Sequence, residues 1–197
     1  TLADTINGGA GIDTINAAAG DDVIDGGDGA DVITSGTGDD TVTGGAGIDD
    51  IRFATADLTL ADTVDAGEGV DLLTISDAAT LADADFTGVT NVETLEFEAA
   101  TTSVVLGAEA AEAGIVTIAN KAVVTSLTLG ATFTNDVSIT LAAANLNDNI
   151  LAGSYTGVLS LAEAADNIDG NDTFTGGTGT SDTLTITSSS TAITDTE

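Results

Sequence analysis

The strongest constraint on the fold of this chain is a nine-residue repeat in its first 52 residues. Five units follow one another in register over residues 8–52: GGAGIDTIN, AAAGDDVID, GGDGADVIT, SGTGDDTVT and GGAGIDDIR. A glycine, an aspartate and an Ile or Val each recur once per unit at a fixed place, and Asp4 belongs to the tail of a sixth unit. A fixed short period is typical of solenoid proteins, in which each repeat packs only on its neighbours.

Each unit divides into a turn half and a strand half. Glycines allow the turn to adopt positive φ without a steric penalty and allow its carbonyl groups to approach a metal ion closely. The aspartate adds a hard anionic oxygen, which suits Ca²⁺. The end of each unit, such as Thr14-Ile15-Asn16, predicts a short strand with its central side chain inward and its neighbours outward. Two units then close one coil of a flattened parallel β-roll.

These units closely resemble the RTX (repeats-in-toxin) nonapeptide family, G-G-x-G-x-D-x-U-x, whose repeats bind Ca²⁺. The resemblance implies that each ion lies between turns two units apart, with turn carbonyls completing its shell. It assigns the first ion to Asp13 and Asp31, the second to Asp22 and Asp40, and the third to Asp31 and Asp49, so Asp31 serves two ions. The full candidate set for several ions is Asp4, Asp13, Asp22, Asp31, Asp40, Asp49, Asp71, Asp172, Gly8, Gly27, Gly29, Gly36, Gly38, Gly45 and Gly47.

Two details of the repeat bear on this assignment. Ala17 and Ala18 replace both leading glycines of the second unit, which leaves the geometry of that turn open. Asp21 and Asp39 stand one place before the candidate ligands, and we expect them to face solvent. The alternative interpretation, that all these aspartates are ordinary solvated turn residues, does not explain why Gly, Asp and Ile keep to three separate columns.

The remainder of the chain is less regular. The repeat breaks over FATADLTLA and returns as a degenerate unit that contains Asp71. Between about residues 76 and 165 the glycine columns vanish, but short runs such as VETLEF, TSVVL, IVTIA, TSLTL, VSITL and VLSLA persist, some at similar spacings. This spacing predicts an irregular β-solenoid or a β-sandwich. AEAAEA at residues 108–113, followed by Gly114, predicts a single helical turn with a glycine cap.

Repeat-like units return near the end of the chain, with Asp172 in DGNDTFT and Asp182 in GGTGTSDTL. An extra residue before Asp182 shifts it relative to its glycines, so Asp172 is the better candidate ligand. The sequence therefore predicts an all-β chain with an RTX β-roll at 1–52, an insertion and degenerate unit at 53–75, a Thr/Ala-rich β region at 76–165, terminal RTX-like units at 166–187 and a tail or linker at 188–197.

The charge of the chain limits its partners. It has 33 Asp and Glu against Arg52 and Lys121, a formal net charge of −31. We therefore expect this chain neither to bind nucleic acid nor to insert directly into an anionic membrane, because like charges repel. A folded chain with this charge needs multivalent cations to neutralise part of it, which predicts calcium-dependent folding. The chain also has no His and no Cys, so we expect no enzyme that depends on those residues.

The function that fits best is structural, with no catalysis. RTX units interrupted by Thr- and Ala-rich segments, with phrases such as TGVTNVETL, resemble the surface-layer proteins and large adhesins of Gram-negative bacteria. This resemblance implies a secreted, extracellular or cell-surface segment, exported by a type I system, which folds and assembles on Ca²⁺ outside the cell. We expect the secretion signal to lie outside this stretch.

We expect the partners of this segment to be copies of itself or neighbouring segments of the same assembly, with a cell-surface glycan as a further candidate. The alternative is a calcium-binding secretion or folding module of an RTX enzyme whose catalytic domain lies elsewhere. A flat threonine array for ligand binding is disfavoured, because the outward positions Thr14, Val23, Val32 and Thr41 form no threonine ladder.

Overall fold

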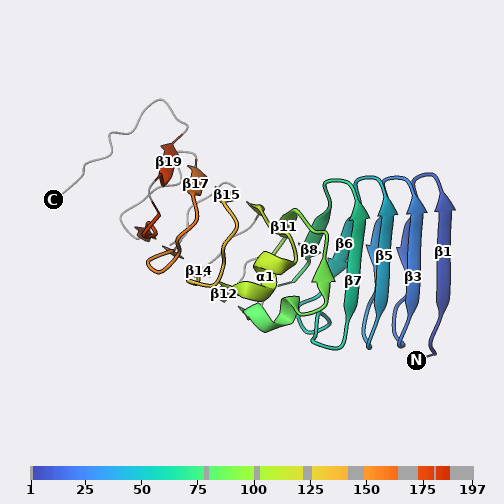
Figure 1. The fold of residues 1–197 in the computed structure, drawn as a ribbon. Helices are drawn as coiled ribbons and strands as arrows, with labels where there is room; N and C mark the ends of the chain where they lie inside the picture. The colour runs from blue at the N-terminus through green and yellow to red at the C-terminus, as the bar shows by residue number, and fades with distance from the viewer. Residues whose placement is uncertain are drawn as a thin grey trace.

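The computed structural model of the chain describes residues 2–77, 80–99, 103–121, 126–141, 149–163, 173–179 and 181–186. These residues form a parallel β-solenoid whose coils stack along one axis, with β1 at the N-terminal end (Figure 1). Helix in the described part of the chain is limited to a single 3-10 turn, η1 (Asp83–Phe86), and the short helix α1 (Ala108–Glu112). The predicted all-β solenoid is confirmed. The region after residue 76 continues the solenoid and does not form the alternative sandwich.

Three parallel sheets build the solenoid. Sheet A contains, in spatial order, β1 (Thr5–Ala10), β3 (Val23–Asp28), β5 (Thr41–Ala46), β7 (Thr63–Glu68) and β10 (Val89–Thr90). Sheet B contains β2 (Thr14–Asn16), β4 (Val32–Thr34), β6 (Asp50–Phe53), β8 (Leu72–Ile75), β11 (Thr94–Phe97), β13 (Thr117–Asn120), β15 (Val137–Leu141), β17 (Leu159–Glu163) and β19 (Thr183–Ile186). Sheet C contains β9 (Thr80–Leu81), β12 (Ser103–Leu106), β14 (Leu127–Leu129), β16 (Asn149–Leu151) and β18 (Thr173–Thr175).

Two nonapeptides make one coil in the first half of the solenoid. Ile15 pairs with Ile33 and Ile33 with Ile51, so each inward residue pairs with its equivalent two units further along the chain. The insertion after Phe53 lengthens the next coil, yet Ile51 still pairs with Leu73 in register. Later coils keep this greater length, as the pairing of Leu73 with Leu95 shows.

The core of the solenoid is a double column of inward side chains. The inward Ile and Val residues predicted from the repeat are buried, whereas their neighbours Thr14 and Asn16 are exposed. A parallel strand presents every second side chain to the same face, so one β-branched residue per short strand suffices to continue the column. The inward positions of the roll are Ile15, Ile24, Ile33, Val42 and Ile51.

Two further sequence expectations are confirmed. The segment 108–113 forms the single helical turn α1, and Gly114 follows it with a φ of 104°. Asp21 and Asp39, which precede the candidate ligands, are exposed. Among the described residues, no helix has the length and apolar character needed to cross a membrane.

The inward column should carry most of the packing energy of the roll. We expect Ile33→Ala, at a site with no exposed surface, to lower the free energy of unfolding of the calcium-saturated protein by about 2–5 kcal/mol. Val23→Ala, at a residue that is 49% exposed on the outer face, should cost less than about 1 kcal/mol. Urea unfolding followed by circular dichroism measures both; equal losses would contradict the inward assignment.

Candidate metal centre

The turns of the roll lie along two edges. Edge 1 consists of the turns that lead from sheet A to sheet B, and Asp13, Asp31, Asp49 and Asp71 each end one of them. Edge 2 consists of the turns that lead back from sheet B to sheet A and contains Asp4, Asp22, Asp40 and Asp62. In Figure 1, edge 1 of the roll lies at the top and edge 2 at the bottom, beside the N-terminus. The two-unit spacing thus places alternate aspartates of the repeat on opposite edges.

Successive aspartates on one edge are joined by a hydrogen bond that we call the carboxylate clamp. The backbone N–H of one aspartate donates to Oδ1 of the aspartate one coil later, as Asp13 does to Asp31 at 2.8 Å. On edge 1 the series continues through Asp31 to Asp49, Asp49 to Asp71, and Asp71 to Oε2 of Glu93, with distances of 2.8, 2.8 and 2.9 Å. On edge 2 it runs from Asp4 to Asp22, Asp22 to Asp40 and Asp40 to Asp62, with distances of 2.7, 2.9 and 2.8 Å.

The second carboxylate oxygen of most of these side chains has no hydrogen-bond partner. It is buried and unpartnered in Asp13, Asp22, Asp31, Asp40, Asp49 and Asp71. The cost of burying an anionic oxygen without a partner is several kcal/mol, so native proteins normally supply a partner or a metal ion. Such oxygens, arranged in two regular rows, are therefore suited to bind cations.

Carbonyl groups of the turns line the same two edges. The carbonyl oxygens of Gly9 and Gly11 point into the space that a Cβ on Gly27 and on Gly29 would occupy. A Cβ on Gly26 would also lie only 2.7 Å from Oδ2 of Asp31. The absence of side chains on these glycines thus leaves a polar cradle between successive turns. The same approach of a carbonyl to a glycine one coil later recurs at Gly36, Gly38, Gly45, Gly47, Gly67 and Gly69.

The alanine unit keeps this geometry at a conformational cost. Ala18 has a φ of 75°, in the left-handed region that Gly27 adopts at the matching position with 102°. Its carbonyl oxygen still points at Gly36, as the Gly9 carbonyl points at Gly27. The replacement of glycine by alanine, which left the geometry of this turn open at the level of sequence, therefore adds strain and preserves the position of the carbonyl.

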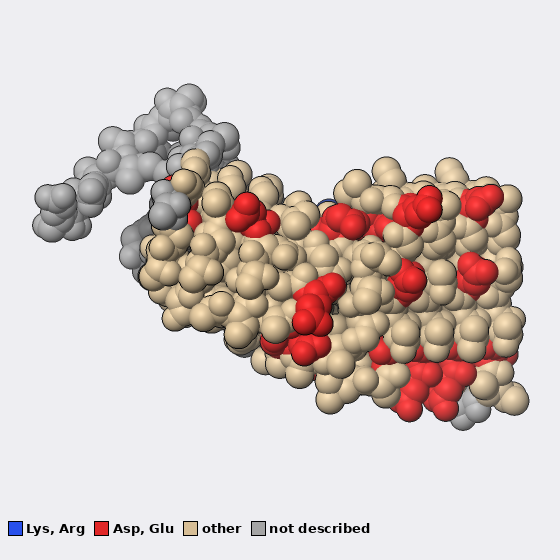
Figure 2. All heavy atoms as spheres, viewed as in Figure 1, with Lys and Arg blue, Asp and Glu red and all other residues tan. Residues whose placement is uncertain are grey.

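The rows of carboxylates are not neutralised by the basic residues of the chain. Arg52 pairs with Asp50 at 2.7 Å and with Glu98, and Lys121 pairs with Glu96 at 2.5 Å, all on the strands of sheet B or directly after them. On the face drawn in Figure 2, acidic side chains gather over the roll and along its edges.

Burial raises the pKa of the carboxyls of Asp40, Asp49 and Asp71, although the N–H of the clamp opposes the rise and neighbouring carboxylates add to it. A raised pKa means that the ionised form weakens the fold as pH rises towards neutrality, unless a cation binds.

Two members of the clamp series were missed by the sequence analysis. Asp62 accepts the clamp from Asp40, but its Oδ2 also accepts the Thr59 N–H at 2.7 Å, so it ends the edge 2 series without a free oxygen. On edge 1, Glu93 stands where an aspartate would and accepts the last N–H of the series, from Asp71. The insertion after Phe53 sets the 22-residue spacing of Asp62 from Asp40. The next coil is equally long and sets the same spacing of Glu93 from Asp71. The echo of the start of the chain in TLADTV at 59–64 was a signal for Asp62.

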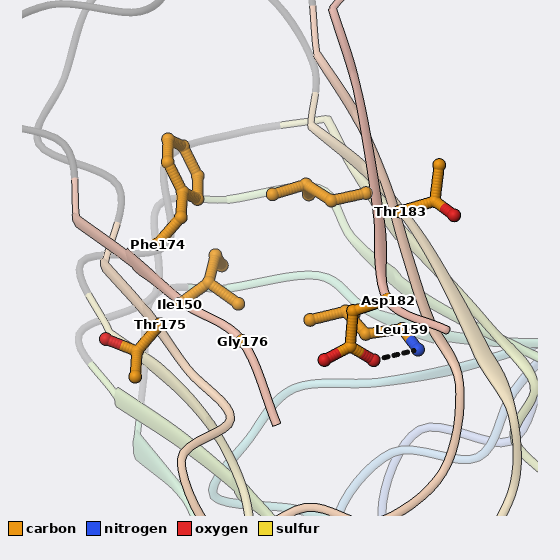
Figure 3. A pocket seen from close by; sticks show the side chains of 8 residues that line it. Ile150, Leu159, Phe174, Thr175, Gly176, Asp182 and Thr183 are labelled. Atoms are coloured by element: carbon orange, nitrogen blue, oxygen red, sulfur yellow. Dashed lines mark hydrogen bonds between the residues drawn. The ribbon is translucent and has the colours of Figure 1, made fainter. Parts of the chain in front are cut away.

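The C-terminal candidates differ from the roll. Asp172 lies outside the described residues. Both carboxylate oxygens of Asp182 already accept backbone N–H groups, from Leu159 at 3.1 Å and from Gly177 at 2.9 Å. A pocket beside it, lined largely by apolar side chains such as Leu159 and Phe174, ends the core between sheets B and C (Figure 3). Both carboxylate oxygens of Asp182 already accept hydrogen bonds, and the rest of the described lining is largely apolar. This pocket therefore lacks the free oxygen ligands of a metal site.

The comparison with protein families agrees with this geometry. A family model described as the RTX calcium-binding nonapeptide repeat (4 copies) matches residues 1–33, 17–51 and 168–181, about a third of the chain. The chain carries RTX calcium-binding repeats. No curated protein and no solved structure matches the chain significantly.

The residues of the RTX roll fit Ca²⁺ by the chemistry of their donors. Ca²⁺ takes six to eight oxygen ligands from carboxylates and carbonyls, and each cradle offers one unpartnered carboxylate oxygen and carbonyls of the turns. Among the described residues, no three acidic side chains converge on one point, so backbone carbonyls would have to complete each shell. When bound, the ion would supply the positive charge that the buried carboxylates lack.

The cradle can be tested by two variants that each remove one negative charge, the first at a candidate ligand and the second at an exposed position close to it. Asp31→Asn should raise the calcium midpoint of folding at least tenfold, because Asp31 contributes a buried, unpartnered oxygen and a clamp. Asp28→Asn removes the same charge from an exposed position of the same turn and should change the midpoint less than about threefold, through screening alone. Calcium titration followed by circular dichroism measures both; similar midpoints for the two variants would refute the site.

The strain at Ala18 should be relieved by glycine. An L-residue in the left-handed region lowers the stability of the fold by about 1–2 kcal/mol. Glycine avoids this strain, but its greater freedom in the unfolded chain lowers stability by about 0.4–1 kcal/mol. We therefore expect Ala18→Gly to stabilise the calcium-loaded roll by about 0.5–1 kcal/mol. Ala30→Gly, at an exposed turn position without positive φ, should destabilise it. Thermal unfolding in saturating Ca²⁺ compares the two; stabilisation by both glycines would exclude strain as the cause.

Proposed function

We propose that this chain is a calcium-stabilised structural segment of a secreted bacterial surface protein, which folds and assembles when it binds Ca²⁺ outside the cell. The observation that carries the proposal is the pair of rows of buried carboxylate oxygens that lack a partner, in a chain of net charge −31. One ion lies between Asp13 and Asp31, one between Asp22 and Asp40 and one between Asp31 and Asp49, each completed by turn carbonyls. Asp49 with Asp71 extends the row on edge 1.

Export fits this calcium requirement. Extracellular calcium modules have dissociation constants of about 10⁻⁴–10⁻³ M, and sites of that strength stay empty at cytosolic calcium levels. The roll then remains unfolded before export, since its buried carboxylates repel one another, and folds once calcium is plentiful. RTX repeat proteins are typically secreted by bacteria, which supports the same location.

A row of exposed apolar side chains on edge 1 supports assembly with further copies of the chain. Ile12, Ile48 and Val70 occupy the place just before the clamp aspartate in their turns and are 80%, 59% and 57% exposed; Ala30 occupies it in the turn between. The row exists only when the turns stack, and the ions that stack them also neutralise the charge behind it. Calcium thereby both creates the contact surface and lowers the repulsion between copies.

A calcium titration combined with a measurement of mass tests this function. The protein should gain β-structure on addition of Ca²⁺, lose it in EDTA, and form assemblies visible by electron microscopy and sedimentation only with calcium. Equal β-structure with and without calcium would overturn the folding switch, and strict monomers at high concentration in calcium would overturn assembly.

The apolar row provides the matched variants. Ile12→Thr, Ile48→Thr and Val70→Thr together should abolish assembly while leaving the calcium titration unchanged. Val23→Thr with Val105→Thr, which removes exposed apolar side chains elsewhere (49% and 40% exposed), should assemble normally. A screen for turnover of peptides, esters and glycans tests the proposal that the role of this chain is structural. Robust activity on any of these substrates would contradict that proposal.

A further inference from the structure

The two halves of the solenoid hold different amounts of apolar core. The coil at residues 23–40 buries two apolar side chains, Ile24 and Ile33. The longer coil at residues 94–115 buries seven, namely Leu95, Phe97, Val104, Leu106, Ala110, Ala113 and Ile115. Hydrophobic burial is the main favourable term in folding. The coil at residues 94–115 therefore gains more burial free energy to offset its loss of conformational entropy than the coil at residues 23–40 does.

Buried charge also differs between the halves. The roll buries clamp carboxylates whose second oxygen no basic residue of the described chain approaches. In residues 94–163, by contrast, the one acidic residue described as buried is Glu96, and Lys121 neutralises it at 2.5 Å. The described part of residues 94–163 thus supplies the cation for its own buried carboxylate.

The turns that lead into sheet B change their means of attachment at the same place. In the turn that ends at Glu93, the Val92 N–H donates at 2.9 Å to the carbonyl of Ala113, which lies in the turn that contains α1. The side-chain amide of Asn135 then donates to the carbonyls of Ala111 at 2.9 Å and Ile115 at 3.1 Å. Neutral side-chain and backbone hydrogen bonds therefore join these turns, together with the exposed carboxylate of Asp136, which accepts the Val158 N–H at 2.8 Å. The clamp aspartates of the roll are, in contrast, largely buried.

Aromatic side chains fill the interior of the following turns. The hydroxyl of Tyr155 donates to the Asn135 carbonyl at 2.5 Å, and the Thr178 N–H donates back to the Tyr155 carbonyl at 2.8 Å. The rings of Phe133 and Tyr155 are fully buried and lie 6.0 Å apart between centroids. Side-chain contacts and hydrogen bonds within the protein thus fill the interior of these turns.

We propose that residues 94–163 fold without calcium and act as the template on which the RTX roll forms, coil by coil, towards the N-terminus. This inference rests on the calcium dependence of the roll that the proposed function includes. The template presents the edge of β11, which pairs with β8 over Thr94–Phe97, and Glu93 beside it offers the first clamp to Asp71. Each roll coil then adds to an ordered edge, which avoids the entropy of starting a solenoid from disordered chain.

Hydrogen–deuterium exchange of the full chain, read by mass spectrometry, separates the two halves in one sample. In EDTA, peptides over β11, β13, β15 and β17 should exchange at least about 100-fold more slowly than the unfolded chain. Peptides over β1 to β6 should exchange within about threefold of the unfolded rate. At increasing Ca²⁺, protection should reach β7 and β8 first and β1 and β2 last.

The outcomes distinguish the two proposals. If neither half responds to calcium, the calcium-dependent function fails. If both halves lose protection together in EDTA, or if β1 and β2 gain protection before β8, the template inference fails while the calcium-dependent function stands.

Variants in each half provide an independent readout through Tyr155, the one tyrosine of the chain. Its near-UV circular dichroism should persist in EDTA in the parent and in Asp31→Asn, although Asp31→Asn raises the calcium midpoint of the roll. Tyr155→Phe, which deletes only the hydroxyl, should lower the urea midpoint of the β11–β17 peptides in EDTA and shift the calcium midpoint less than twofold. Loss of the tyrosine signal in EDTA, or a tenfold shift of the calcium midpoint by Tyr155→Phe, would overturn the template.

Discussion

Stacking in the RTX roll depends on one aspartate per turn, whose two carboxylate oxygens differ in their partners. Oδ1 accepts the backbone N–H of the preceding coil, and this clamp fixes the spacing of the turns. Oδ2 is buried and unpartnered, so the same contact that orders the turns also concentrates negative charge along each edge. Hydrogen bonds to Oδ1 therefore fix the turns, while Oδ2 has no partner among the described residues. A divalent cation with a preference for oxygen would balance the charge on Oδ2.

The thin core of the roll follows from the same constraint. A nonapeptide unit places one large apolar side chain in the core, because its other inward positions are taken by glycine, aspartate or small residues. Ile33, which pairs with Ile15 in one coil and with Ile51 in the next, is typical. Such a core contributes little per coil, so the ionic edges must contribute much of the stability. Ca²⁺ bound at these edges would then stabilise the stacking of the coils.

Much of this arrangement could be predicted from the sequence because the repeat encodes it locally. The columns of Gly, Asp and Ile give the turn, the charged edge and the inward strand, and two units per coil give the register. The clamp could not be predicted, since a backbone N–H of one coil meets a carboxylate of the next only after the coil has closed. Asp62 and Glu93 were missed for a related reason, because the coils that end at these residues are longer than two nonapeptides and the nine-residue period no longer aligns them with the Asp column.

The second half of the solenoid shows what the same topology requires when the aspartate column ends. Its longer coils, as between Leu95 and Ile118 or Ile118 and Ile139, have room for a second inward residue per strand and for turns with their own hydrophobic contents. Phe133 and Tyr155 occupy those turns, and Asn135 joins one to the next. Parallel pairing continues through both halves, so the strand register does not depend on the type of turn. The short, glycine-rich turns lined with buried carboxylates distinguish the first half, and they are the place where a bound cation would balance the charge.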